Sequence, residues 1–153
     1  MLSISPWHGV TTVVLGNCGF GVAPTRPHQR DLIVTTLEKV EGMSPATLNE
    51  GLGNDRPFES FPEYLDAIDD LGTAINVGVL LCHTPTRLYV MGEEACEREA
   101  SADEIAQMRK IVVEALDAGA LGFATSKSPS HAGFKGKPVP SRVASLDELE
   151  SLA

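Results

Sequence analysis

Six residues that could bind a metal ion, move a proton or hold a substrate lie at or soon after an apolar segment of this sequence. They are Asn17, Cys18, His83, Ser126, Lys127 and His131. A cysteine thiolate is either a metal ligand or a nucleophile. Histidine binds metals and transfers protons, while the lysine ammonium binds anions. These residue types are typical of a catalytic or binding site.

Cys18 follows the strand-like residues of the stretch TTVVLGNCGFG, which spans positions 11–21. A cysteine that only fills a core is expected within the apolar residues, because free cysteine is usually buried. At the end of a strand, Cys18 is either a small packing residue or a group that meets a ligand. Cys82 and Cys96 have no evident partner and are interpreted as packing residues.

The two candidate histidines each have a second interpretation. His83, within LLCHTPTR, can bind a ligand, move a proton or hold an oxyanion, but it can equally cap a loop through hydrogen bonds. His131 lies in a loop rich in glycine and proline, where a solvated surface histidine is equally expected. A thiol enzyme with Cys18 as nucleophile and His83 as base stays open as an alternative.

Three helices are predicted by the same signal, a serine followed three residues later by a glutamate, which forms a capping box. The signal occurs at 60–63, 101–104 and 145–148. Gly72 and Gly119 are expected to end the first two helices, because glycine is common just past a helix end. A further helix is predicted across residues 30–40 from the spacing of its apolar residues.

Apolar segments rich in strand-forming residues alternate with these helices, at 10–15, 74–81 and 120–125. Such alternation is typical of a parallel sheet buried on both faces, so the predicted class is α/β. The connections that leave the strands are long, and long connections are commonly functional. Because parallel α/β proteins place their sites at the carboxyl ends of strands, the six candidate residues should gather there.

Composition excludes several classes of function. The 153 residues, 42% hydrophobic and 22% charged, are enough for one soluble domain. A formal net charge of −9 argues against nucleic-acid partners, and no apolar run approaches the roughly 18 residues of a membrane span. Three widely spaced cysteines form neither a disulfide framework nor a CxxC pair, which favours a cytoplasmic location. No phosphate-binding glycine loop or serine-hydrolase elbow is present.

Three blocks of the sequence resemble the D-aminoacylase, or N-acyl-D-amino-acid deacylase, branch of the amidohydrolase superfamily. The first is HGVTTVVLGNCGFGVAPTRP, the second runs from FESFPEYLD to TRLYVMG, and the third runs from DEIAQMRK to SLDEL. The resemblance covers nearly the whole chain, and GNCG after GVTTVV is its most specific part. It implies a TIM-type (β/α)8 barrel that hydrolyses the amide bond of an N-acyl-D-amino acid.

The resemblance also implies that Cys18 is a zinc ligand, at a position where related enzymes use a bridging carboxylate. Zinc activates a bound water at neutral pH and polarises an amide carbonyl. Asn17, His83, Ser126, Lys127 and His131 are then expected to bind substrate or to support the site. Lys127 lies near the position of a carboxylated, metal-bridging lysine in many amidohydrolases, but we favour it as a ligand for a substrate carboxylate.

The family's HxH pair, its later histidines and its aspartate base have no counterpart here. A complete barrel needs roughly 250 residues. We therefore expect residues 1–153 to be a fragment of a single metal-dependent hydrolase barrel domain, about strands 2 to 4 with their helices, and inactive alone. Alternatives are an amidohydrolase acting on a cyclic amide or another C–N bond, and a non-catalytic α/β binding module. The oligomeric state is not predicted.

Overall fold

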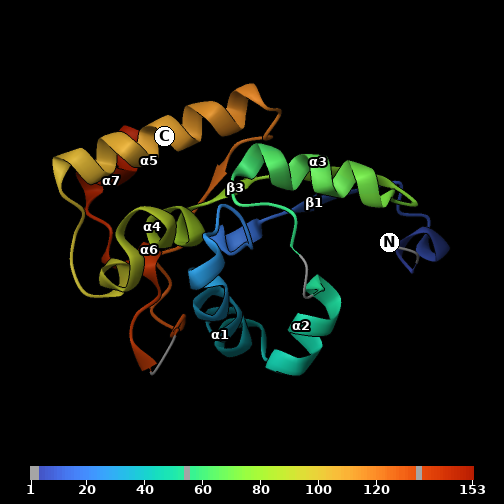
Figure 1. The fold of residues 1–153 in the computed structure, drawn as a ribbon, viewed down its shortest axis with the longest axis horizontal. Coiled ribbons are helices and arrows are strands. Elements are labelled where there is room, and N and C mark those ends of the chain that lie inside the picture. The colour runs from blue at the N-terminus through green and yellow to red at the C-terminus, as the bar shows by residue number, and fades with distance from the viewer. Residues whose placement is uncertain (1–3, 54–55, 134–135) are drawn as a thin grey trace.

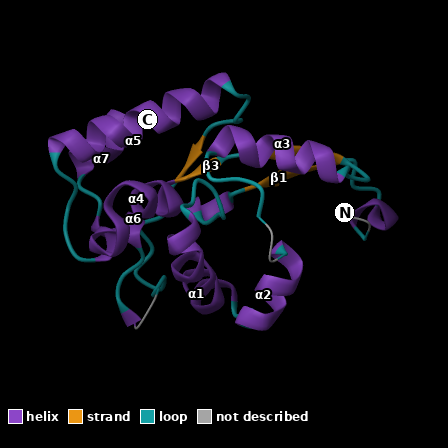
Figure 2. Ribbon diagram, in the orientation of Figure 1, coloured by secondary structure: helices purple, strands orange, loops and turns teal. Residues whose placement is uncertain are grey.

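A computed structural model describes residues 4–53, 56–133 and 136–153 of the chain. Its strands are β1 (Thr12–Leu15), β2 (Asn76–Val79), β3 (Leu81–Cys82) and β4 (Phe123–Ala124). Its α-helices are α1 (Arg30–Glu41), α2 (Pro45–Leu52), α3 (Phe61–Leu71), α4 (His83–Met91), α5 (Ala102–Asp117), α6 (Pro140–Val143) and α7 (Leu146–Leu152). Figure 2 shows how helices predominate over the short strands. No helix in the described ranges is long and apolar enough to cross a membrane.

Both strand pairs in the described residues are parallel, as predicted. β1 pairs with β2 over four residues, from Thr12 opposite Asn76 to Leu15 opposite Val79. β3 and β4 form a second two-stranded sheet. Only Leu80 separates β2 from β3; its N–H donates to Leu15 O, and the next N–H, of Leu81, donates to Gly122 O, so β2 and β3 form a nearly continuous central strand. The predicted α/β class is therefore confirmed.

The strands are shorter than the apolar segments that predicted them. The segment 120–125 contributes only Phe123 and Ala124 to a strand. Gly122, the residue before this strand, has a φ of +154°, outside the range of a regular strand. Hydrogen bonds from the Leu121 N–H to Val79 O and from the Leu81 N–H to Gly122 O, both 2.9 Å, still hold the segment against the central strand.

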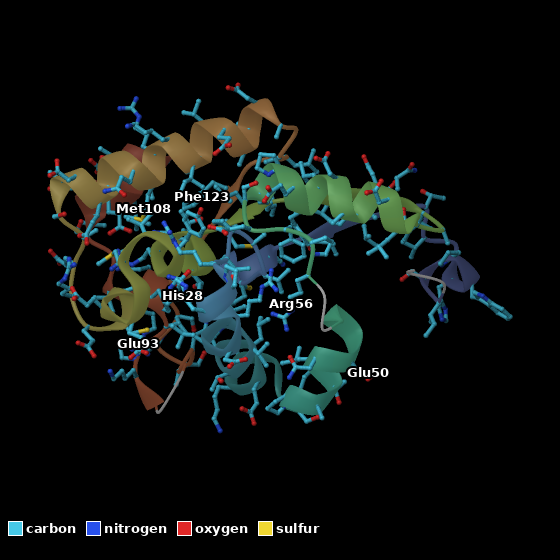
Figure 3. The ribbon with its side chains drawn as sticks, in the orientation of Figure 1. His28, Glu50, Arg56, Glu93, Met108 and Phe123 are labelled. Atoms are coloured by element: carbon cyan, nitrogen blue, oxygen red, sulfur yellow. The ribbon has the colours of Figure 1, made fainter. Side chains whose placement is uncertain are left out.

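The main core lies between the strands and the helices α3, α5 and α7. Its fully buried members are Phe61, Val79, Leu81, Met108, Val112, Ala115 and Leu152. Figure 1 shows α3 and α5 along the same side of the strands, with α1 and α2 on the other side. In Figure 3, Met108 of α5 and Phe123 of β4 both lie beneath α5, and Phe123 packs against the core that contains Met108. The main core therefore holds α3, α5 and α7 against the strands.

A second, smaller core joins α1 to α4. It contains Ile33 of α1, Leu88 and Met91 of α4, and Ala95 of the following 3₁₀ turn (Gly92–Cys96). The sequence predicts a long connection after the segment 74–81, but much of it is helical, because α4 begins at His83 directly after β3. The sequence hides this start: Cys82 at the N-cap makes no side-chain cap, and Pro85 in the first turn resembles a helix breaker.

The predicted capping boxes of α3 and α5 are confirmed. Ser60 and Ser101 each accept a hydrogen bond from the backbone of the glutamate three residues on, and that glutamate's side chain reaches back. The third box was only half right. Ser145 accepts from the Glu148 N–H at 3.1 Å, but the Glu148 carboxylate does not reach back to cap the helix. It turns into the protein, where it becomes part of the site described below.

Candidate active site at the carboxyl ends of the strands

Cys18 lies in a short 3₁₀ turn (Asn17–Gly19) at the end of β1 and is exposed. Its φ of +58° makes it the one non-glycine residue with a positive φ among the residues the structure describes. Such a backbone costs an L-residue roughly 1–2 kcal/mol. Neither burial nor a packing role explains a cysteine at this position, so its exposed thiol is the group that a function would use.

Glycines let this turn lie directly on the ends of β3 and β4. A Cβ on Gly16 would come within 2.6 Å of the Leu80 carbonyl oxygen, and one on Gly19 within 2.8 Å of the Ala124 carbonyl oxygen. Both glycines also have positive φ values, of +92° and +75°. The turn that carries Cys18 is therefore held against two neighbouring strands by contacts that only glycine permits.

The buried thiol of Cys82 also holds this turn in place, through hydrogen bonds to its backbone. Its Sγ lies 3.3 Å from Gly16 O and 3.2 Å from Phe20 O, so it can donate to either carbonyl. Burial raises the pKa of Cys82 to about 12, which keeps the thiol protonated and able to donate. Cys82 therefore does more than the packing we had assigned to it, because it anchors the backbone on both sides of Cys18.

Ser126 and His131 lie together beside this turn. The Ser126 hydroxyl is 3.1 Å from Nδ1 of His131, and the imidazole ring meets the Phe20 ring edge-on at 5.0 Å between centroids. Phe20 is two residues from Cys18, so His131 lies next to the Cys18 turn. Asn17 is exposed, and its side-chain oxygen accepts a hydrogen bond from the Cys18 N–H at 3.1 Å.

Lys127 is exposed, and its ammonium group turns away from these residues toward α6. It donates to the carbonyl of Arg142 at 3.0 Å and also to that of Ala144, at the carboxyl end of α6. A cation at the end of a helix satisfies free carbonyls and is favoured by the helix dipole. In this arrangement Lys127 is a positively charged helix cap.

His83 is fully buried, and both of its ring nitrogens have partners. Nδ1 lies 2.8 Å from Thr125 Oγ1, and Nε2 lies 2.8 Å from Glu148 Oε1. The other oxygen of Glu148 accepts from Arg87, which is also fully buried and donates to the carbonyls of Ala95 and Arg98. With both nitrogens occupied, His83 is not available as a base for the Cys18 thiol.

Burial and hydrogen bonding set the charges of this cluster. Burial lowers the pKa of His83 below its ordinary value, outweighing the opposite effect of Glu148, and so favours the neutral ring. Burial alone would raise the pKa of Glu148, but the hydrogen bonds from His83 and Arg87 outweigh it and lower that pKa. The cluster therefore consists of a neutral His83, an ionised Glu148 and the Arg87 cation.

Cys18 is the one group here whose chemistry fits a metal directly. An exposed thiol is a zinc donor when deprotonated. Within the described residues, no three His, Cys, Asp or Glu side chains come together as a metal-binding group. Among the described residues, the exposed thiol of Cys18 is therefore the candidate metal ligand at this end of the strands, and Ser126 and His131 lie near its turn.

No family model matches the chain. The D-aminoacylase of Alcaligenes xylosoxydans xylosoxydans is 37% identical over 117 residues, which cover 76% of this chain and 21% of that protein. The N-acyl-D-glutamate deacylase of the same organism is 32% identical over 145 residues, covering 95% of this chain and 25% of that protein. The chain belongs to the D-aminoacylase branch of the amidohydrolase superfamily.

Solved structures of the branch agree with the fold. The N-acyl-D-glutamate deacylase from Bordetella bronchiseptica, complexed with zinc and a phosphonate inhibitor, aligns at a TM-score of 0.66 and 32% identity. This alignment covers 95% of the present chain and 25% of the deacylase chain. A D-aminoacylase described as defining a novel subset of amidohydrolases aligns at a TM-score of 0.63 and 31% identity. That alignment covers 94% of this chain and 25% of the D-aminoacylase chain. The chain thus spans about a quarter of these relatives' length.

Sequence reasoning missed two residues of this region, Glu148 and Thr125. Glu148 is separated from His83 by 65 positions, and its spacing from Ser145 fits a capping box so well that no other role is signalled. Thr125 ends an apolar segment and looks like an ordinary strand residue. A glutamate followed by a leucine-rich helix gives no sign that its carboxylate is buried.

Proposed function

We propose that the full-length protein carrying these residues is a metal-dependent hydrolase that cleaves the amide bond of an N-acyl-D-amino acid. The reaction adds water across the C–N bond and releases a carboxylic acid and the amino acid. The curated relatives named above support this proposal, because they are deacylases of this substrate class.

The observation that carries the proposal is the position of Cys18. Its exposed thiol is held on a strained backbone at the carboxyl end of a parallel strand, by glycines and by the buried Cys82. Parallel α/β enzymes bind substrates at that end of their strands. We infer that Cys18 is a zinc ligand and that zinc, when bound, supplies an activated water.

The chain's other residues would position the substrate around this ligand. His131 and Ser126 lie next to the Cys18 turn and can hold a polar group of the substrate. Asn17 orders the backbone of the turn itself. Lys127 can bind a substrate carboxylate only if its ammonium leaves the α6 carbonyls, so we rank it below His131 for that role.

We further infer that residues 1–153 form one segment of a larger (β/α)8 barrel domain, about its second to fourth strands. The parallel pairing of β1 with β2 and of β3 with β4, with α3 and α5 along one side of the strands, supports this inference. A catalytic zinc site usually takes three protein ligands. Because no group of three possible metal ligands occurs within the described residues, we expect the isolated chain to hydrolyse no substrate.

The test uses the full-length protein and its Cys18→Ala variant. Bound zinc is measured by elemental analysis, and turnover is measured on N-acetyl-D-amino acids, their L-enantiomers and cyclic amides. We expect hydrolysis of the D-amino-acid derivatives, with a large loss of both zinc and turnover in the variant. The Cys96→Ala variant is the matched control, because that thiol is buried away from the Cys18 turn.

Full zinc occupancy and unchanged turnover in Cys18→Ala would contradict the role of Cys18 as a ligand. Cleavage of cyclic amides in preference to N-acyl-D-amino acids would show that the proposed substrate class is wrong, while the proposed metal-dependent mechanism would stand. Metal-independent binding of these compounds without turnover would identify a binding module instead of an enzyme.

A further inference from the structure

The donor and the acceptor of each hydrogen bond around the His83 ring can be assigned, beginning with Glu148. An ionised carboxylate only accepts hydrogen bonds. One oxygen of Glu148 accepts from the permanently charged Arg87, and the other faces Nε2 of His83 at 2.8 Å. Nε2 therefore carries a hydrogen and donates a hydrogen bond to Glu148.

The assignment at Nε2 also fixes the donor and the acceptor of the hydrogen bond between Nδ1 of His83 and Thr125. A neutral imidazole has one donor and one acceptor nitrogen, so Nδ1 of His83 accepts when Nε2 donates. The atom 2.8 Å from Nδ1 is Thr125 Oγ1. The Thr125 hydroxyl must then donate its hydrogen to His83. The lowered pKa of His83 supports this neutral state.

Thr125 itself is exposed, directly after β4, on the same face as Cys18. The backbone of Gly19, the residue after Cys18, lies so near that a Cβ there would come within 2.8 Å of the Thr125 Cα. With its hydrogen committed to His83, the Thr125 oxygen retains lone pairs alone. It can accept a hydrogen bond from a ligand, and it has no hydrogen left to donate.

We propose that Thr125 Oγ1 accepts a hydrogen bond from the amide N–H of the bound substrate, with His83 and Glu148 as positioning residues that fix the direction of this bond. The inference rests on the proposed function and adds a basis for selecting amides. A secondary amide has the required N–H, whereas an ester with the same acyl group has only an oxygen there. Binding sites that pair with a polar group discriminate strongly against analogues that lack it.

The first experiment measures the protonation of the His83 ring directly. Nitrogen NMR of the ¹⁵N-histidine-labelled full-length protein, with His83→Gln for assignment, should show a proton on Nε2 and an unprotonated Nδ1. In the Glu148→Gln variant, the amide oxygen still accepts from Arg87 while its NH2 donates to Nε2. The proton should therefore move to Nδ1 of His83. A wild-type ring with its proton on Nδ1 would overturn the proposal.

The second experiment uses the full-length protein with two matched ligands, an N-acetyl-D-amino acid and the O-acetyl ester of the corresponding 2-hydroxy acid. Thr125→Val removes the hydroxyl at constant shape and should raise KM for the amide about tenfold, the effect of one lost hydrogen bond. KM for the ester should not change. Thr125→Ser should keep the preference for the amide, and Glu148→Gln should lose it with Thr125 intact.

The outcomes separate this inference from the proposed function. If Thr125→Val changes KM for amide and ester equally while amide turnover continues, the role of Thr125 is wrong and the proposed function stands. If the wild-type protein hydrolyses no N-acyl-D-amino acid, both fail. Thermal melting accompanies each variant, and the NMR experiment on the wild-type protein tests the hydrogen-bond direction even if Thr125→Val does not fold.

Discussion

The carboxylate of Glu148 lies 2.8 Å from Nε2 of His83, and both side chains are fully buried although 65 positions separate them in the sequence. The bond joins α7, near the carboxyl end of the chain, to the start of α4. The other ring nitrogen of His83 forms a hydrogen bond with Thr125, which directly follows β4. The contact between Glu148 and His83 therefore connects α7 to the end of β4. Four predictions concern this contact and the Cys18 turn.

Glu148→Ala should lower the free energy of unfolding of the chain by about 3–5 kcal/mol, because it leaves the buried Arg87 cation and the His83 N–H without their acceptor. Urea unfolding of the chain measures the change. The matched control is Glu150→Gln on the same helix, where an exposed charge should contribute less than about 0.5 kcal/mol. Equal effects of the two substitutions would show that the buried cluster does not stabilise the fold.

Acidification should destabilise the chain, beginning below about pH 6.5 through His83. The pKa of His83 is lowered from 6.5 by burial, so the unfolded chain binds more protons than the folded chain as the pH falls, and the free energy of unfolding decreases. Below 4.5 the lowered pKa values of Glu148, Glu63 and Glu104 act in the same direction. Melting temperatures recorded between about pH 7.5 and about pH 5 follow the upper part of this loss.

His83→Gln provides the comparison for the pH experiment. Glutamine cannot be protonated in this range, so the variant should start less stable and lose less stability between about pH 7 and about pH 5. A wild-type curve that stays flat over that interval, or a variant curve that falls just as steeply, would contradict the assignment of this loss to His83.

Gly19→Ala should destabilise the chain more than Gly9→Ala does. The two glycines have nearly the same φ, +75° and +77°, so an alanine is strained by about 1–2 kcal/mol at either position. Only at Gly19 would the new Cβ meet backbone atoms within 2.8 Å, whereas nothing lies within 4 Å at Gly9. The difference between the two losses, measured by urea unfolding, reports how tightly the Cys18 turn lies on β4.

Cys18 should react with iodoacetamide much faster than the other two cysteines. Its side chain is exposed, whereas Cys82 and Cys96 are buried, and burial raises the pKa of both and so depletes their reactive thiolates. Mass spectrometry of timed samples at neutral pH locates the label. Cys18→Ser should abolish the rapid reaction, and added zinc should slow it in the full-length protein if Cys18 is a ligand. Early labelling of Cys82 would refute the buried anchor beneath the turn.

The sequence alone was sufficient for the elements whose signals are local. A capping serine can be paired with a glutamate three residues away, so the starts of α3 and α5 were predicted to the residue. Apolar segments between helices predicted the α/β class and parallel pairing. The stretch GNCG singled out Cys18 as a candidate ligand, a prediction that the variants above test, and the structure places this cysteine exposed at the end of β1.

Tertiary structure decided everything that depends on contacts between distant segments. The same Ser-x-x-Glu pattern begins α3 and α7, yet Glu63 caps its helix while Glu148 enters the interior. Local geometry allows both conformations, and Arg87 and His83 decide between them, since two buried donors stabilise an ionised carboxylate more than a helix end exposed to water does. The role of Thr125 follows from that choice, because the direction of its hydrogen bond is set by a charge that only the folded chain brings near.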